Sequence, residues 1–154
     1  MKSPRRRARE FALQGLYQWQ LTGNELPAIE AHLAGVAGFE KADKGFFDML
    51  LRGAVGEAAA LAAVIGPHLD RPYSELSPVE RSILLLAAFE LKKHVDAPYK
   101  VIINEAIELA KAYGGTDGHK YVNGVLDALA AELRPNELVR PVRRGKQALG
   151  NKEP

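Results

Sequence analysis

Basic side chains crowd the first nine residues of the chain, where they could bind an anion. Five of these nine residues are basic and none is acidic: Lys2, Arg5, Arg6, Arg7 and Arg9. Like charges at the positive end of a helix dipole destabilise the helix, so an anionic partner would relieve the cluster. Arginine also contacts phosphate with two nitrogens and stacks on bases. The segment alone favours a nucleic-acid site and a plain charged terminus about equally.

Tyr17 is an aromatic candidate in the same predicted helix. At about 100° per residue it lies about 20° from Arg6 on the helical wheel, away from the main apolar stripe. There it could stack an unpaired base. The simpler interpretation is that it packs against a neighbouring helix with its hydroxyl in water, and the residue alone favours that interpretation.

A second off-stripe aromatic occurs near the start of the last predicted helix. Tyr121 could stack a base, with Lys120 neutralising a phosphate and Asp117 accepting a hydrogen bond from a base edge. Asp117 is also a natural N-cap for this helix, with Thr116 as a competitor. His119 and Asn123 lie closer to the buried side and suit core or capping hydrogen bonds.

The residues and motifs that metal binding and common enzymatic reactions require are missing from the sequence. The chain has no cysteine, and its four histidines do not have metal-ligand spacing. Nucleophile-elbow, P-loop and dinucleotide motifs are absent. Glu105 and Glu108 share a helical face, which we expect to be solvated rather than catalytic. We therefore predict a protein that is not an enzyme and has no cofactor or metal. Without an apolar run near 18 residues or a secretory signal, we expect it in the cytoplasm, not in a membrane.

Charge is distributed unevenly along the chain. The formal net charge is +2, yet residues 10–133 carry 10 basic and 17 acidic groups. Residues 134–154 carry six basic groups and two acidic ones. Basic ends suit a polyanion, and an acidic middle suits a basic protein partner. After Pro135 the chain has no helical period, and we predict a disordered basic tail over residues 137–154.

Helix-start and helix-stop signals predict an all-α fold, because a sustained strand pattern is missing. Ser3-Pro4 begins the first helix, and Ser77-Pro78-Val79-Glu80 is a capping box before a helix that is apolar on nearly every face. Two subdomains are expected, residues 1–70 and 71–136. The other predicted helices cover about 27–36, 41–65, 98–113 and 117–133.

Interior features of two predicted helices bear on their packing. Gly53 and Gly56 each weaken the 41–65 helix by roughly 1 kcal/mol relative to alanine. Close approach of a neighbouring helix is the compensation we expect. Tyr113 is placed on the inner stripe of the 98–113 helix, which ends at Gly114-Gly115.

Three long segments resemble the hallmark segments of the NusB family and cover roughly residues 2–136: RRRAREFALQGLYQWQL, PVERSILLLAAFEL and PYKVIINEAIELAKAYGGTDGHKYVNGVLD. The resemblance implies an all-helical protein with two three-helix subdomains. It implies binding to the single-stranded boxA element of nascent RNA together with NusE, a ribosomal small-subunit protein. With NusA, NusG and RNA polymerase, such factors suppress termination, notably on ribosomal RNA operons.

Family positions carry over to individual residues. The RNA-contacting basic segment matches Lys2, Arg5, Arg6, Arg7 and Arg9. The family's first-helix aromatic matches Tyr17, and its aspartate and aromatic near the last helix match Asp117 and Tyr121. Phenylalanine is common at the Tyr121 position. An acidic position at the NusE interface matches Glu80, which also belongs to the capping box.

Three alternatives remain open on the sequence. The first is an RNA-binding domain like that of some ribosomal RNA cytosine methyltransferases, although no methyltransferase domain or glycine-rich cofactor loop follows. The second is a helical DNA-binding regulator, although a clear helix-turn-helix pair is lacking. The third is a homodimer that uses the RNA-binding surface, which light scattering with and without RNA would test.

Overall fold

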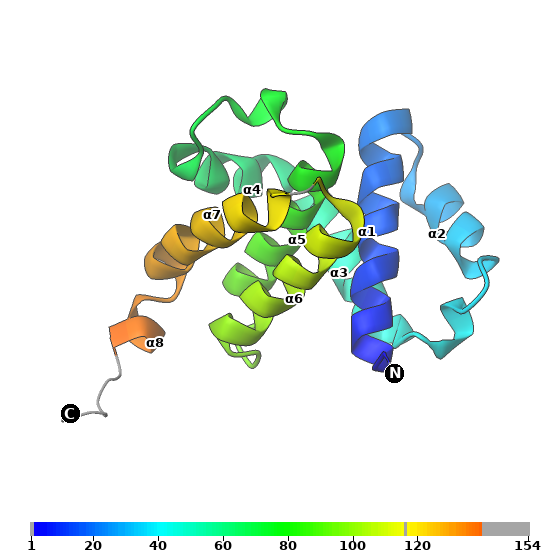
Figure 1. Cartoon of the computed structure of the whole chain (residues 1–154). Helices are drawn as coiled ribbons and strands as arrows, with labels where there is room; N and C mark the ends of the chain where they lie inside the picture. The colour runs from blue at the N-terminus through cyan, green and yellow to red at the C-terminus, as the bar shows by residue number, and fades with distance from the viewer. Residues whose placement is uncertain (1, 116, 140–154) are drawn as a thin grey trace.

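The computed structural model describes residues 2–115 and 117–139, and every regular element within them is a helix (Figure 1). The all-α prediction is confirmed. The α-helices and short 3-10 helices are α1 (Pro4–Thr22), α2 (Leu26–Ala34), η1 (Phe39–Lys41), α3 (Lys44–Gly56), α4 (Ala58–Ile65), η2 (Gly66–His68), η3 (Tyr73–Glu75), α5 (Pro78–Lys93), α6 (Tyr99–Tyr113), α7 (Gly118–Leu133) and α8 (Pro135–Val139).

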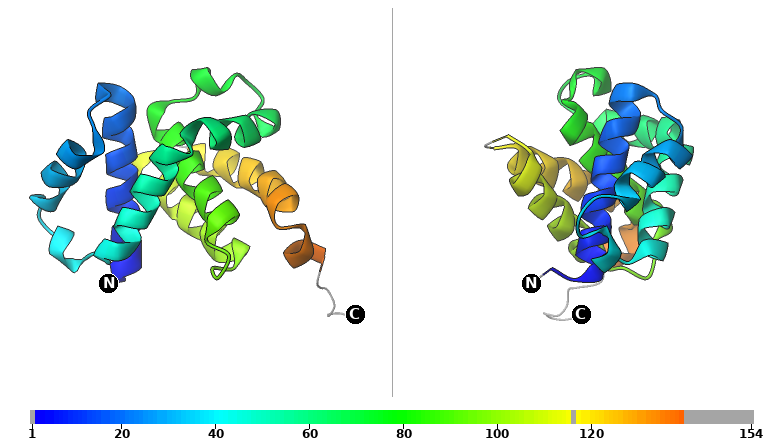
Figure 2. Two further views of the ribbon diagram at one scale, coloured as in Figure 1. Left: turned by 180° about the vertical axis from the view of Figure 1, so that it is seen from behind. Right: turned by 90° about the vertical axis from the view of Figure 1, so that its right-hand side faces the viewer.

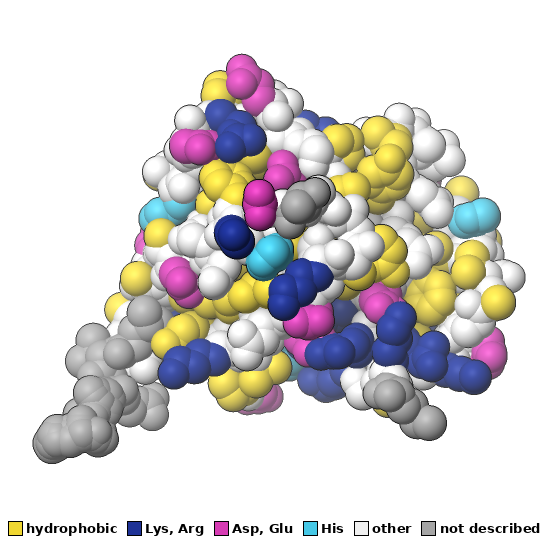
Figure 3. All heavy atoms as spheres, in the orientation of Figure 1, with side chains coloured by type: hydrophobic (Ala, Val, Ile, Leu, Met, Phe, Trp, Pro, Cys, Tyr) yellow, Lys and Arg dark blue, Asp and Glu magenta, His cyan; other side chains and the backbone are white. Residues whose placement is uncertain are grey.

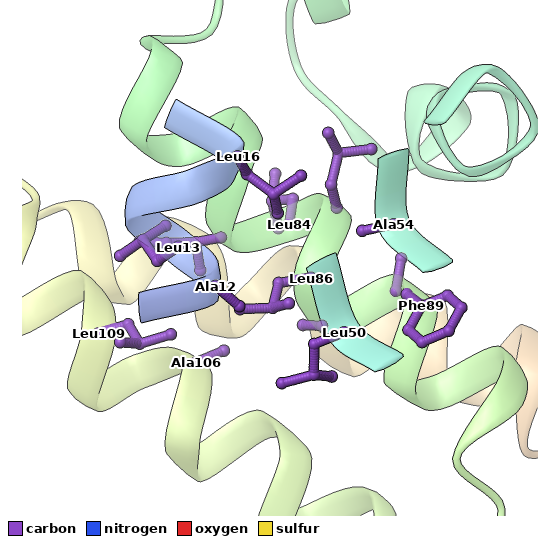
Figure 4. Close-up of a cluster of buried hydrophobic side chains, with 14 of the residues drawn as sticks. Ala12, Leu13, Leu16, Leu50, Ala54, Leu84, Leu86, Phe89, Ala106 and Leu109 are labelled. Atoms are coloured by element: carbon purple, nitrogen blue, oxygen red, sulfur yellow. The ribbon is translucent and has the colours of Figure 1, made fainter. Parts of the chain in front are cut away.

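Helix α1 begins and ends at local capping signals and is buried on two sides. The Ser3 hydroxyl accepts a hydrogen bond from the Arg6 backbone N–H, and Gly23 ends the helix with a φ of 68°. The predicted apolar stripe is buried at residues such as Leu16. Leu13, which the helical wheel places off that stripe, is buried as well, and Figure 4 shows it near Leu109 of α6. One side of α1 therefore packs on α2 and α3, and another on α5 and α6.

The prediction of a single helix over residues 41–65 is wrong. This segment forms two helices, α3 and α4, and the helix axis bends by 74° between Lys44–Gly56 and Ala58–His68. The Asp43 carboxylate caps α3 by accepting from the Phe46 N–H at 3.0 Å. Gly56, a poor helix former, is where α3 ends, and the bend lets α4 pack its buried Leu61 and Ile65 toward α5.

Helix α5 is the central element of the molecule. The Ser77–Glu80 capping box is present at its start, and residues 82–91 are all buried. It contacts α1, α3, α4, α6 and α7, and Figure 4 shows side chains of α1, α3 and α6 converging around it. Figures 1 and 2 show α2 and α7 on opposite sides of the molecule, with α1, α3 and α5 between them. One continuous apolar core results, and the subdomain boundary near residue 70 stays a prediction.

The C-terminal end of α5 is capped by a distant arginine. Arg134 is 8% exposed, and its guanidinium donates to the carbonyls of Glu90, Leu91, His94 and Ala97 at 2.7–3.3 Å. Its Nη1 also donates to the Glu137 carboxylate at 2.7 Å. Carbonyls at a helix end lack helical partners, so a buried cation there stabilises α5.

The prediction of a disordered tail from residue 137 is wrong over its first residues. Glu137 lies in the short helix α8, where its carboxylate accepts hydrogen bonds from Arg134 and from the Tyr99 backbone N–H. The contact with Tyr99 is tertiary, so the sequence around Glu137 did not reveal it. The rest of the predicted tail, residues 140–154, lies outside the described residues.

No single helix among the described residues has the length and apolar composition needed to cross a membrane. The bent pair Lys44–Gly56 and Ala58–His68 passes that length-and-composition test only when its two parts are taken together.

Gly53 and Gly56 provide a matched test of the α3–α5 packing. A Cβ atom at Gly53 would overlap the ring of Phe89, whereas one at Gly56 would meet nothing within 4 Å. We therefore expect Gly53→Ala to lower the free energy of unfolding by about 1–3 kcal/mol, because the helices must separate. Gly56→Ala should leave it unchanged or raise it by up to about 1 kcal/mol. Urea unfolding measures both, and equal effects would contradict the close approach.

Candidate nucleic-acid interface

The N-terminal basic segment forms a cationic edge at the start of α1. In Figure 3, lysine and arginine side chains gather over the end of the molecule where α1 begins. Lys2 pairs with Glu10 at 2.9 Å, and the Arg5 guanidinium lies 4.3 Å from the centroid of the Phe46 ring. The Arg7 side chain forms no ion pair or hydrogen bond with any described residue. These cations are at least partly exposed.

Arg6 is held by a carboxylate from α6. Its Nε and Nη2 donate to the two oxygens of Glu105 at 3.1 and 2.7 Å, and this hydrogen bonding raises the pKa of Arg6 above its usual value. The expectation that Glu105 is solvated is wrong, because its side chain is only 16% exposed. Arg6 remains 42% exposed. A phosphate would use the same two nitrogens that Glu105 occupies.

Arg9 does not lie on the cationic edge. It is buried where α1 meets α5, and its Nε and Nη2 each donate to an oxygen of Glu90 at 2.8 Å. The His94 ring lies 3.0 Å from the same carboxylate, and Glu105 is 3.8 Å from Arg9 Nη1. The sequence placed Arg9 with the RNA-binding arginines, but its position on the buried stripe of α1 gives it a structural role.

A groove runs between α1 and α6, with a charged hollow and an apolar one. The charged hollow, about 160 Å³, is lined by Lys2, Arg6, Glu10, Glu105, Glu108, Leu109 and Ala112. The apolar one, about 390 Å³, is lined by Leu13, Gln14, Tyr17, Gln18, Val79 and Tyr113. Tyr17 lies 11 residues after Arg6, or about 16 Å along the helix axis. Arg6 and Tyr17 therefore line the same side of α1, where it faces α6, without touching.

Tyr113 lies in this groove, contrary to the prediction that it faces the core. Its side chain is 42% exposed, and Tyr17 is 38% exposed. Partial burial raises the pKa of the Tyr113 phenol. The position at the last turn of α6, just before two glycines, explains the difference, since no further turn covers the ring.

Tyr121, near the start of α7, is held by the loop between α4 and α5. Its hydroxyl donates to the Asp70 carboxylate at 3.0 Å and accepts from the Asp70 N–H at 3.3 Å. The Arg71 guanidinium lies 4.7 Å from its ring centroid. Burial and the Asp70 carboxylate raise the pKa of Tyr121. Sequence reasoning missed Asp70 and Arg71, because nothing in a loop sequence indicates which helix it will contact.

Asp117 and Lys120 are the most exposed of the predicted site residues. Their side chains are 76% and 73% exposed and lie 3.6 Å apart. Asp117 occupies the N-cap position of α7, but its side chain makes no capping hydrogen bond. Its carboxylate is thus not committed to the helix. Thr116, the competing cap, lies outside the described residues, and Asn123 is exposed rather than buried.

Glu80 serves the capping box while remaining partly exposed. Its Oε1 accepts from the Ser77 N–H at 3.4 Å. A Cβ placed on Gly118 would lie 3.7 Å from the other oxygen, Oε2. Glu80 therefore adjoins the first turn of α7, near Asp117. Within the described residues, no three acidic or histidine side chains are grouped so that they could hold a metal ion.

Comparison with known proteins shows which family has this sequence and fold. The model of the NusB family matches residues 6–131. The chain belongs to the NusB family. Two similar relatives are both described as transcription antitermination protein NusB. The one from Paraburkholderia phytofirmans is 61% identical over 137 residues, which cover 89% of this chain and 95% of the relative. The one from Dechloromonas aromatica is 58% identical over 137 residues, covering 89% and 84%.

Solved NusB structures share the fold. The structure of T. maritima NusB superimposes with a TM-score of 0.77 at 33% identity, covering 90% of this chain and 99% of that one. A chain in the structure of antitermination factors NusB and NusE in complex with double-stranded RNA superimposes with a TM-score of 0.73 at 25% identity, covering 86% and 99%. The resemblance of the three sequence segments to the NusB family is confirmed.

The two kinds of arginine in the basic segment differ in their expected effect on stability. Arg9→Ala leaves the Glu90 charge buried without its bidentate partner, so we expect the free energy of unfolding to fall by about 3–5 kcal/mol. Arg7→Ala removes a side chain without an ion pair and should change it by less than about 0.5 kcal/mol. Urea unfolding of the two variants tests this. The same midpoint for both would contradict the structural role of Arg9.

Proposed function

We propose that this NusB-family chain is a transcription antitermination factor that binds RNA and works by assembly rather than catalysis. The observation that carries the proposal is the cationic edge of Lys2, Arg5, Arg6 and Arg7, of which Lys2 and Arg6 line the α1–α6 groove. Support also comes from its relatives, which are described as transcription antitermination proteins, and from the similar fold in the complex of NusB and NusE with double-stranded RNA. The RNA is proposed to be the single-stranded boxA element, notably of ribosomal RNA transcripts.

The proposed binding mode assigns most phosphate contacts to the cationic edge and the base contacts to aromatic side chains of α1 and α7. The cationic edge holds phosphates, with Arg6 exchanging the Glu105 carboxylate for a phosphate. Tyr17 and Tyr121 stack or flank unpaired bases, Lys120 neutralises a phosphate, and Asp117 accepts from a base edge. Arg9 is excluded from direct contact because it is buried.

The protein partner is proposed to bind beside the RNA. Glu80 is assigned to the NusE interface. Because Glu80 adjoins Gly118, a partner that contacts Glu80 would lie close to Asp117 at the start of α7. A partner there would extend the RNA surface and raise affinity, a coupling of about 1–3 kcal/mol being typical of linked ligands. The resulting complex would join NusA, NusG and RNA polymerase.

A boxA titration with and without NusE, at two salt concentrations, tests this function. We expect modest affinity for the chain alone, a clear gain when NusE is present, and weaker binding at the higher salt concentration. A scrambled RNA of the same length serves as the control. Absence of any gain from NusE would contradict the assembly mechanism.

Arg6 and Tyr121 are expected to contribute differently to RNA binding. Arg6→Ala should weaken binding of boxA and scrambled RNA alike and reduce the salt slope by about 1, because a phosphate contact is independent of sequence. Tyr121→Ala should mainly lose discrimination between the two RNAs, since base stacking is worth about 1–3 kcal/mol. Fluorescence anisotropy titrations measure both. If Tyr121→Ala binds boxA as the wild type does, Tyr121 is not part of the site.

Glu105 is expected to compete with RNA for Arg6. Glu105→Gln removes the charge that holds Arg6, and a partly exposed ion pair is worth about 0.2–1 kcal/mol. We therefore expect RNA to bind up to about fivefold more tightly. Glu108→Gln is the matched control, because Glu108 lies one turn further along α6 and pairs with Lys111 at 3.8 Å rather than with Arg6. Equal gains in the two variants would indicate a general charge effect without direct competition.

A further inference from the structure

A cation outside the N-terminal segment lies directly against a proposed base-binding ring. The Arg71 guanidinium is 4.7 Å from the centroid of Tyr121 and is contributed by the loop between α4 and α5. Its side chain is 42% exposed. Guanidinium groups stack on aromatic faces and are weakly hydrated, so an arginine on a ring can in turn stack a base.

We propose that Arg71 is an RNA-binding residue that stacks an unpaired base beside Tyr121, with Asp70 as the positioning residue for both side chains. The proposal rests on the proposed RNA-binding function and extends its site to the loop between α4 and α5. The Nε and Nη2 of Arg71 donate to the Asp70 carboxylate at 2.7 and 3.3 Å. Its Nη1 has no hydrogen-bond partner among the described residues and is available to a phosphate or a base edge.

Asp70 holds the ring as well as the guanidinium. The Tyr121 hydroxyl donates to its carboxylate at 3.0 Å and accepts from its backbone N–H at 3.3 Å. The hydrogen bond from Arg71, followed by that from Tyr121, lowers the pKa of Asp70, so the carboxylate is ionised at neutral pH. A phenylalanine at position 121 would keep the ring and lose both hydrogen bonds. The hydroxyl therefore orients the ring relative to Arg71.

The local charge favours unpaired bases over the phosphates of a duplex. Asp70 pairs with Arg71, and Glu80 also lies near enough to act on the Arg71 charge. Lys120, which precedes Tyr121 in α7, is paired with Asp117. The attraction of Arg71 and Lys120 for phosphate is thus partly offset by neighbouring carboxylates, whereas the flat guanidinium over the Tyr121 ring still offers a stacking surface. Single-stranded RNA with exposed bases fits this surface best.

Arg71→Ala, Arg71→Lys and Arg52→Ala form a matched set for the test. Arg52 is also an exposed arginine with two hydrogen bonds to one carboxylate, that of Glu30 at 2.8 and 3.2 Å, but it lies over no aromatic ring among the described residues. With labelled single-stranded boxA RNA, we expect Arg71→Ala to weaken binding by about fivefold to tenfold, as for loss of one stacked base. Arg71→Lys should recover less than half of this loss, and Arg52→Ala should match the wild type.

Base stacking itself is measured from the fluorescence of RNA that carries 2-aminopurine at each position in turn. At the position next to Tyr121, we expect the wild type to change the 2-aminopurine fluorescence, and we expect Arg71→Ala, Asp70→Asn and Tyr121→Phe to lose at least half of that change. Unfolding midpoints equal to that of the wild type would show that the variants are folded.

The outcomes separate this proposal from the function on which it rests. If the wild type binds boxA RNA but Arg71→Ala is indistinguishable from Arg52→Ala, the assignment of Arg71 is overturned and the RNA-binding function stands. If Arg71→Lys binds as the wild type does, the contact is one of charge alone, and the stacking proposal is overturned. If the wild type binds no RNA with or without NusE, both proposals fail.

Discussion

A pair of opposite charges buried between α1 and α5 sets the position of the cationic edge. Arg9 and Glu90 are joined by two hydrogen bonds of 2.8 Å, and both side chains are almost fully buried. Separating such a pair leaves a charge without solvent or partner, which costs several kcal/mol (about 3–5). Helix α1 therefore cannot slide or turn on α5. Arg5, Arg6 and Arg7 precede Arg9 within about one turn, so the same pair determines which way they point.

The buried pair also connects the core with the surface. Glu105 lies 3.8 Å from Arg9 and makes two hydrogen bonds to Arg6, so α6 is tied to both the buried and the exposed arginine. His94, the C-cap residue of α5, contacts Glu90, and its ring centroid lies 5.4 Å from that of Phe46. Charged groups thus link α1, α5 and α6 at one end of the groove. At its other end Tyr17 and Tyr113 supply an apolar surface.

Local signals allowed most helices to be predicted, and long-range contacts explain what was missed. The cap at Ser3-Pro4 and the capping box at Ser77–Glu80 involve residues within one turn, so their types and spacing suffice. The close approach of a neighbouring helix, expected at Gly53 and Gly56, occurs at Gly53 only, because Gly56 ends α3 and has open space beside it. In contrast, Arg9 and Glu90 are 81 residues apart, and nothing within α1 reveals the distant carboxylate that allows this arginine to be buried.

The candidate site could likewise be predicted where local patterns define it, but not where it depends on long-range contacts. Helical periodicity placed Arg6 and Tyr17 on one face of α1, and both line the α1–α6 groove. The contacts of Tyr121 could not be predicted, because Asp70 and Arg71 come from a loop 51 and 50 positions earlier in the chain. Tyr121 itself was a candidate from its off-stripe position and from the family resemblance, but neither indicated the hydroxyl contacts that a phenylalanine would lack.

The arginine that caps α5 has a consequence for the order in which the molecule is completed during synthesis. Leu91, whose carbonyl accepts from Arg134 at 2.7 Å, precedes that arginine by 43 residues. At about 5–20 residues per second, the ribosome adds this stretch in roughly 2–9 s. During that time the central helix has its N-terminal capping box but not its C-terminal cap. Until α7 has been made, α5 can pack on α1, α3 and α4, but it is capped only at its first turn, and the arginine after α7 adds the second cap.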